Sequence, residues 1–173
     1  KGEASIYDSV SGEREAWRNG AELRLYPSRS VFVEFGSPEP VRRRSDVKEV
    51  QCRFSPWRLS FKPGWGAPDS VKLDSLVSWT DIPGFSSEAK AYCGTVVYET
   101  EFEVKSGKGR FMLDLGRVES VAKVYLNGKE IRTLWCEPYS CDIIGFMKSG
   151  LNTLKVEVTN TWRNRVVYDL GQP

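Results

Sequence analysis

The sequence of 173 residues contains no histidine. This absence excludes a Ser-His-Asp or Cys-His catalytic arrangement, and it excludes a zinc or iron site that depends on histidine ligands. General acid–base catalysis would have to rest on carboxylate, Lys, Tyr or Cys side chains. The missing histidines therefore narrow the possible chemistry without excluding an enzyme, because carboxylates alone can serve as general acid and general base.

The sequence also lacks the signatures of two kinds of partner. Lys and Arg number 25 against 23 Asp and Glu, and this net charge of +2 is too close to neutral for a nucleic-acid-binding surface. No apolar run reaches the roughly 18 residues that would predict a membrane span. The chain starts at Lys1 without an initiator Met or a signal peptide, so we expect it to be part of a longer protein.

The four cysteines form no CxxC pair, which argues against a zinc ribbon. Three disulfide pairings are possible, and the sequence does not choose among them. Cys136 and Cys141 are close enough along the chain to bridge a loop, whereas Cys52 and Cys93 stand apart. At this length a hydrophobic core can stabilise the fold without disulfides, so we favour free thiols and leave the pairing open.

Aromatic side chains are abundant, with 6 Trp, 7 Tyr and 8 Phe making up 12% of the chain. Such a content suits the core of a β-sandwich, and it also suits a surface that stacks on sugar rings. Apolar and polar residues alternate most clearly over residues 95–104 and 153–160, which predicts two long strands. Asn127-Gly128 predicts a two-residue hairpin turn, because both turn positions need a positive φ.

Helix signals are nearly absent. Only residues 142–147 favour a helical turn, and the short apolar run 166–168 is predicted to be a strand that closes the sheet. Many short strands separated by turns, with almost no helix, are typical of sandwiches and jelly rolls. The sequence therefore predicts an all-β fold, a jelly-roll β-sandwich.

The N-terminal part is predicted to be set apart from the rest. Residues 23–26 and 31–35 are predicted strands, and the Gly- and Pro-rich stretch 36–40 is the best linker candidate. We expect residues 1–36 to be either the terminal strands of a preceding β-domain or N-terminal strands packed on the sandwich. They are too few to form a core alone. Residues 37–173 are expected to form the jelly-roll domain.

An ordered set of motifs carries a resemblance to a known family. The succession covers about residues 50–170 and is most specific at its end, in the pattern Asn-x-Trp-x-Asn-Arg that starts at Asn160. It resembles the C-terminal galactose-binding-like jelly roll of glycoside hydrolase family 106, the α-L-rhamnosidases, and more broadly the sugar-binding domain of family 2 glycosidases such as β-galactosidase. The motifs lie at residues 73–79, 92–98, 113–118, 121–128, 135–139, 150–154 and 158–165.

The resemblance implies a function for the chain. In such enzymes the catalytic carboxylates belong to a separate barrel domain, and a barrel of this kind needs about 250 residues, more than the whole chain. The resemblance thus implies a non-catalytic accessory domain of a bacterial glycoside hydrolase, periplasmic or extracellular, with no catalytic residue of its own. Its implied partners are a glycan or oligosaccharide and the catalytic domain of the parent chain.

Two alternatives to glycan binding remain open. In the first, the domain is purely structural and an apolar surface patch marks where the catalytic domain docks. In the second, the chain is a small self-contained hydrolase or lyase that uses carboxylate and Tyr side chains.

Sugar binding needs flat aromatic rings on loops, together with polar partners for hydroxyl groups. The candidate carbohydrate-binding residues lie in or beside predicted loops: Trp65, Trp79, Tyr92, Trp135, Glu137 and Tyr139. The Gly and Pro residues around Trp65 argue against a strand core, and for Trp65 and Trp135 both exposure and burial stay open. The alternation around Trp57, Trp79 and Trp162 favours the core, so the core is an alternative for Trp79. Asn164 and Arg165 are expected to fix the last strand by hydrogen bonds.

The acidic residues give no clear metal or catalytic signature. Glu99, Glu101 and Glu103 alternate along one strand, which predicts the solvent face of an amphipathic strand. Asp74, Asp81 and Asp142 are expected to act in turns and caps; no cofactor is implied. A structural Ca²⁺ is conceivable because backbone carbonyl ligands leave no trace in a sequence.

Overall fold

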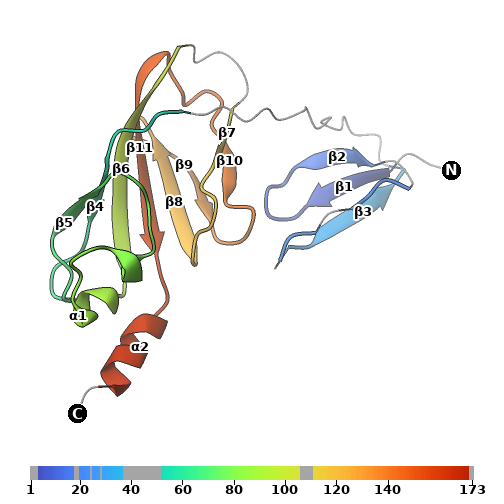
Figure 1. The fold of residues 1–173 in the computed structure, drawn as a ribbon. Coiled ribbons are helices and arrows are strands. Elements are labelled where there is room, and N and C mark those ends of the chain that lie inside the picture. The colour runs from blue at the N-terminus through green and yellow to red at the C-terminus, as the bar shows by residue number, and fades with distance from the viewer. Residues whose placement is uncertain are drawn as a thin grey trace. The chain divides into compact units, whose positions relative to one another are not determined.

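The computed structural model divides the chain into two compact units, Lys1–Val50 and Gln51–Pro173 (Figure 1). The predicted boundary after Gly36 adjoins residues 37–51, which lie outside the described residues, so its position stays a prediction. The structure describes residues 4–17, 20–23, 25–27, 29–36, 52–105 and 111–171.

The first unit contains a three-stranded antiparallel sheet in the order β2-β1-β3. The strands are β1 (Ala4–Asp8), β2 (Arg14–Trp17) and β3 (Val31–Phe35), and β3 matches its prediction. The predicted strand at residues 23–26 is wrong, since its described residues are irregular. The reason is that β2 and β3 already occupy both edges of β1, and Leu23 and Leu25 bury no face.

The second unit is built on a six-stranded antiparallel sheet in the order β5-β4-β6-β11-β8-β9. A two-stranded sheet, β7 with β10, lies over part of one face (Figure 1). The strands are β4 (Trp57–Ser60), β5 (Ser70–Leu73), β6 (Thr95–Val104), β7 (Met112–Asp114), β8 (Val121–Leu126), β9 (Lys129–Leu134), β10 (Ser140–Asp142) and β11 (Gly150–Thr159).

The core lies on one face of the six-stranded sheet. Val96, Tyr98 and Phe102 of β6 point inward, and Leu154 and Val156 of the neighbouring β11 join them. In β11 these inward residues alternate with Lys155 and Glu157, and in β6 with Val97, Glu99 and Glu101, as the period of two requires. The predicted all-β sandwich is therefore confirmed, and its alternating pattern is what sets the buried face.

The hairpin between β8 and β9 is confirmed. Asn127 and Gly128 adopt φ values of 53° and 79°, as a primed turn requires. The Asn127 side chain then donates to the carbonyl of Phe146 and to Oδ1 of Asn152, both at 2.9 Å. Asn152 is completely buried; it also accepts from the Lys148 N–H and donates to the Lys148 and Gly150 carbonyls. This fully paired network ties the hairpin turn to the start of β11.

The described part of the second unit has three short helical segments. They are a 3₁₀ turn η1 (Trp79–Asp81), α1 (Ser87–Lys90) and α2 (Arg163–Leu170). The predicted strand at 166–168 is wrong because these residues belong to α2. The edges of β11 are already paired with β6 and β8, so no sheet edge is available beside it. Residues 142–147 contain the expected single turn, with Phe146 N donating to Ile143 O at 3.1 Å.

The helices of the described residues are all too short or too polar to cross a membrane.

Candidate functional site

A shallow groove lies between η1, α1 and α2 in the second unit. Its volume is about 490 Å³. α1 ends at Lys90, before β6, and α2 begins at Arg163, after β11, so these two helices are more than seventy residues apart in sequence. We call it the α1–α2 groove. It is lined by Thr80, Ser87, Lys90, Ala91, Arg163, Asn164, Val167 and Tyr168.

The side-chain amide of Asn160, a partly buried residue, positions α2 at the end of β11. Asn160 Oδ1 accepts from the Gly94 N–H at 2.9 Å, and Asn160 Nδ2 donates to the Tyr92 carbonyl at 2.9 Å. The Asn160 N–H also donates to the Gly94 carbonyl at 3.2 Å. These bonds join the chain leaving β11 to the loop that follows α1, so α2 begins close to α1.

Contacts between aromatic rings and a guanidinium group also pack against this helix. Trp65 and Trp162 meet edge to face, with ring centroids 5.7 Å apart. The Arg165 guanidinium lies 5.4 Å from the ring centroids of both Trp65 and Tyr168. Its Nε is 2.9 Å from Asp169 Oδ1, and this hydrogen-bonded partner raises the pKa of Arg165. We call Trp65, Trp162, Arg165 and Tyr168 the Trp65–Arg165 cluster.

The groove presents cations, hydroxyl groups, an amide and one aromatic ring. Lys90 and Arg163 are its charged lining residues, and no acidic side chain lines it. Within the described part of the chain, the side chains of Lys90, Arg163 and Asn164 make no hydrogen bond or ion pair. These groups are therefore available to a polar ligand, beside the ring of Tyr168.

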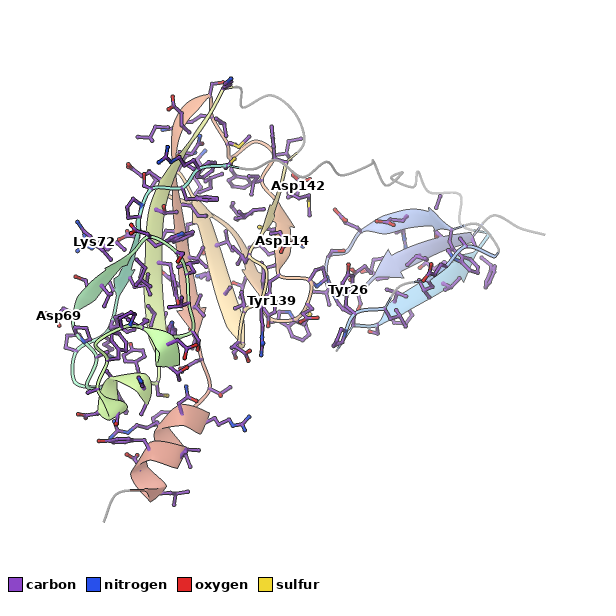
Figure 2. All side chains as sticks on the ribbon, viewed as in Figure 1. Tyr26, Asp69, Lys72, Asp114, Tyr139 and Asp142 are labelled. Atoms are coloured by element: carbon purple, nitrogen blue, oxygen red, sulfur yellow. The ribbon has the colours of Figure 1, made fainter. Side chains whose placement is uncertain are left out.

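Three of the sequence-predicted site residues belong to the core. The indole of Trp79 donates to the Tyr98 hydroxyl, while the Tyr92 hydroxyl accepts from the Lys62 N–H and donates to the Thr95 carbonyl. Tyr139 donates to the Ser120 carbonyl at 2.7 Å and lies beside β10 (Figure 2). All three are nearly inaccessible, so no ring face is left to stack on a sugar. Sugar contact is wrong for these three, and the core alternative holds for Trp79.

The remaining predicted residues are accessible but do not form one site. Trp135 is 57% exposed, and Glu137 follows it on the surface. Trp65 is half-buried by Trp162 and Arg165 rather than exposed. Trp135 follows β9 at one edge of the six-stranded sheet, whereas Trp65 lies between β4 and β5 at the other. The structure therefore does not bring the two predicted aromatic sites together.

The predictions for the other tryptophans and for the final motif are only partly right. Trp57 packs against the core as expected, but Trp162 is 61% exposed because the chain leaves β11 and enters a helix. Asn164 and Arg165 do not fix the last strand; Asn164 lines the groove and Arg165 joins the Trp65–Arg165 cluster. The pattern Asn-x-Trp-x-Asn-Arg is the signal in the sequence that marks this region, but by itself it favours a strand rather than a helix that lines a groove.

Glu99, Glu101 and Asp142 lie as the sequence indicates. Glu99 and Glu101 lie on the outer face of β6, where Glu99 is the cross-strand neighbour of Arg58 and Lys155. Asp142 accepts from the Ile144 N–H at 2.9 Å, and Asp114 accepts from the Gly116 N–H at 2.8 Å (Figure 2). Among the described residues, no group of three or more Cys, Asp and Glu gathers as metal ligands.

All four cysteines carry free thiols. Cys93, Cys136 and Cys141 are buried and Cys52 is partly buried, so the loop that Cys136 and Cys141 could have closed is not bridged.

The second unit has the fold of a galactose-binding-like β-sandwich. Residues 88–167 match the family described as glycosyl hydrolase 2 galactose-binding domain-like. A putative β-glucuronidase of Formosa agariphila is 35% identical over 121 residues, which are 68% of this chain and 10% of that protein. The chain is thus related to glycoside hydrolases and spans about a tenth of that relative.

Solved structures give the same relationship. A rhamnosidase from Novosphingobium sp. PP1Y superimposes with a TM-score of 0.72 and 27% identity, covering 97% of this chain and 17% of that one. A β-glucuronidase from Ruminococcus gnavus superimposes with a TM-score of 0.53 and 27% identity, covering 64% of this chain and 20% of that one. The rhamnosidase match extends into the first unit.

Proposed function

We propose that this chain is a non-catalytic, carbohydrate-binding accessory region of an α-L-rhamnosidase-like glycoside hydrolase of the family 106 type. The observation that carries the proposal is the likeness to the rhamnosidase over 97% of the chain, compared with 64% for the glucuronidase. The family match of residues 88–167 supports the sugar-binding character. A periplasmic or extracellular location in a bacterium is part of the proposal, since glycans of plants or microbes are met there.

The α1–α2 groove is the place where we expect the glycan to bind. Tyr168 offers an aromatic ring, and Asn164, Ser87 and Thr80 offer amide and hydroxyl groups of the kind that pair with sugar hydroxyls. One shallow groove contacts a single sugar unit. The expected affinity is therefore weak, because little surface is buried.

Titration by NMR tests the binding role. Rhamnose-containing oligosaccharides are added to the ¹⁵N-labelled chain, and we expect amide peaks of α1 and of the first turn of α2 to shift. The buried side-chain amide of Asn152, at the start of β11 and away from the groove, serves as an internal control and should not respond. If no peak moves at tens of millimolar ligand, the glycan-binding role is refuted and a structural role remains.

The outer surface of α2 favours a second candidate, a docking role against the catalytic domain of the parent chain. Trp162, Val166 and Leu170 recur every four residues and are mostly exposed, Leu170 by 82%. With docking as the only function, sugars produce no peak shifts. Replacing Val166 and Leu170 with Lys should then weaken binding to a parent enzyme that lacks this region, measured by calorimetry.

The proposal includes the absence of catalysis in this region, and the self-contained hydrolase remains its rival. We expect the isolated chain to release no product from an aryl α-L-rhamnoside. Turnover above the uncatalysed rate would revive the rival, and replacing Glu99 with Gln, on the outer face of β6, would serve as a control that leaves such turnover unchanged.

A further inference from the structure

The charged side chains that line the α1–α2 groove are all positive. Lys90 stands at the end of α1 and Arg163 at the start of α2, and both face the same 490 Å³ space. The other lining residues are neutral. Two cations without a lining carboxylate make a place where an anion gains favourable electrostatic energy.

The nearby acidic groups do not cancel this charge. Asp169 is held 2.9 Å from Arg165, and Glu88 is 3.9 Å from the same guanidinium, so Arg165 is the partner of both. Asp81 is adjacent to Thr80 and within 3.4 Å of its hydroxyl, but it does not line the groove. The positive charge at Lys90 and Arg163 therefore remains directed at the groove.

The start of α2 also favours an anion in the groove. In its first turn the helix has no acidic residue, and its N-cap residue, Trp162, makes no side-chain cap. Helix starts carry partial positive charge on their unpaired N–H groups, so this end of α2 favours an anion as well. It acts together with the two cations and would not make a site without them.

We infer that the α1–α2 groove binds the anionic group of an acidic sugar, either the carboxylate of a uronate or a sulfate ester. Arg163 and Lys90 pair with the anionic oxygens, and Asn164 and Tyr168 contact the rest of the ring. The inference rests on the proposed carbohydrate-binding function and narrows it to charged glycans. The shared chemistry is a singly charged oxyanion on a sugar ring.

The test compares charged and uncharged sugars on the full-length chain by NMR titration. The probes are a galacturonate disaccharide, a sulfated galactose and the uncharged galactose disaccharide, with acetate and inorganic sulfate as free anions. We expect the charged sugars to bind at least about fivefold more tightly than the uncharged one at low salt. The preference should shrink at about 150 mM salt, where the screening length is about 8 Å.

Variants assign the preference to the groove. Arg163→Gln and Lys90→Ala should each weaken binding of the charged sugar about fivefold and leave the uncharged sugar unaffected. Lys72→Ala is the matched control, because Lys72 is an exposed lysine on β5 and does not line the groove (Figure 2). All three positions are exposed, so near-ultraviolet circular dichroism should show an unchanged fold.

The outcomes separate this inference from the proposed function. If charged and uncharged sugars bind equally, the charge preference is refuted while carbohydrate binding stands. If no sugar binds, both proposals fail. If acetate or inorganic sulfate competes as well as the charged sugars do, the groove is a simple anion site and the inference is refuted. A preference for only one of the two charged sugars supports the inference and identifies the anionic group.

Discussion

We expect the substitution Asn152→Ala to lower the free energy of unfolding of the second unit by about 3–5 kcal/mol. The Asn152 side chain makes four hydrogen bonds and is completely buried. Each bond contributes about 1 kcal/mol net, and the partly buried groups left behind lose a partner. Those groups are the Lys148 N–H, two carbonyls, and the amide of Asn127.

Urea titration followed by tryptophan fluorescence measures this effect. Five of the six tryptophans lie in the second unit, so the signal reports mainly on its unfolding. Asn164→Ala is the matched control, because this exposed amide has no side-chain hydrogen bond to the described residues; its effect should stay within about 0.5 kcal/mol. The reasoning is refuted if Asn152→Ala and Asn164→Ala destabilise the unit equally.

Asn152→Asp distinguishes the role of the donating Nδ2 from the role of the accepting Oδ1. A carboxylate keeps the oxygen that accepts from Lys148 and Asn127, but it places negative charge against the Lys148 and Gly150 carbonyls. Burial and these carbonyls should raise the pKa of the new carboxyl group, so stability is regained as pH falls and is lost as pH rises. A variant whose stability, relative to the native chain, does not depend on pH would contradict this account.

Three further predictions concern the same unit. Gly66→Ala should destabilise the unit by about 1 kcal/mol more than Gly64→Ala does. Both glycines have a positive φ and share that penalty, but an added Cβ overlaps the Glu88 side chain only at Gly66, while Gly64 faces open space. Midpoints of urea unfolding compare the two variants. Tyr98→Phe should cost about 1–3 kcal/mol in the same assay, since the buried indole N–H that it accepts from loses its partner. Burial raises the pKa of the Cys141 thiol from 9.0 to about 11, so the folded state holds this proton more tightly than the unfolded state does. The stability that the neutral thiol contributes is therefore fully present below pH 9 and is lost as pH rises toward 11. Cys141→Ala should flatten that decline, and an equally steep decline in the variant would contradict the assignment.

The sandwich could be predicted from the sequence because its strands obey a simple rule. Residues 95–104 and 153–160 alternate cleanly, and a sheet with one buried face demands this alternation wherever the strands pair. The hairpin could be predicted because Asn127-Gly128 suits a two-residue turn whose positions both need a positive φ. The strand predicted at 166–168 failed because a run of three apolar residues fits a helix and a strand equally well, and the available sheet edges decide between them.

The candidate site could be predicted only in part. A tyrosine or tryptophan has an apolar ring and a polar atom, so it suits both a sugar platform and a core with a hydrogen-bond partner. The Tyr92 hydroxyl accepts from the backbone N–H of Lys62 and the Tyr139 hydroxyl donates to the Ser120 carbonyl; both partners are far along the chain, so no local pattern reveals them. The groove was missed because Lys90 and Arg163 approach each other only after β6 and β11 have paired.

The pattern Asn-x-Trp-x-Asn-Arg has a physical explanation once its side chains are followed in turn. Asn160 turns inward and fixes where β11 ends, and Trp162 and Arg165 pack on Trp65 to hold the helix that follows. Asn164 is then directed into the groove. Asn160, Trp162 and Arg165 therefore position α2, and Asn164 is the only one of the four that lines the groove. A site organised in this way depends most on residues that never touch what it binds.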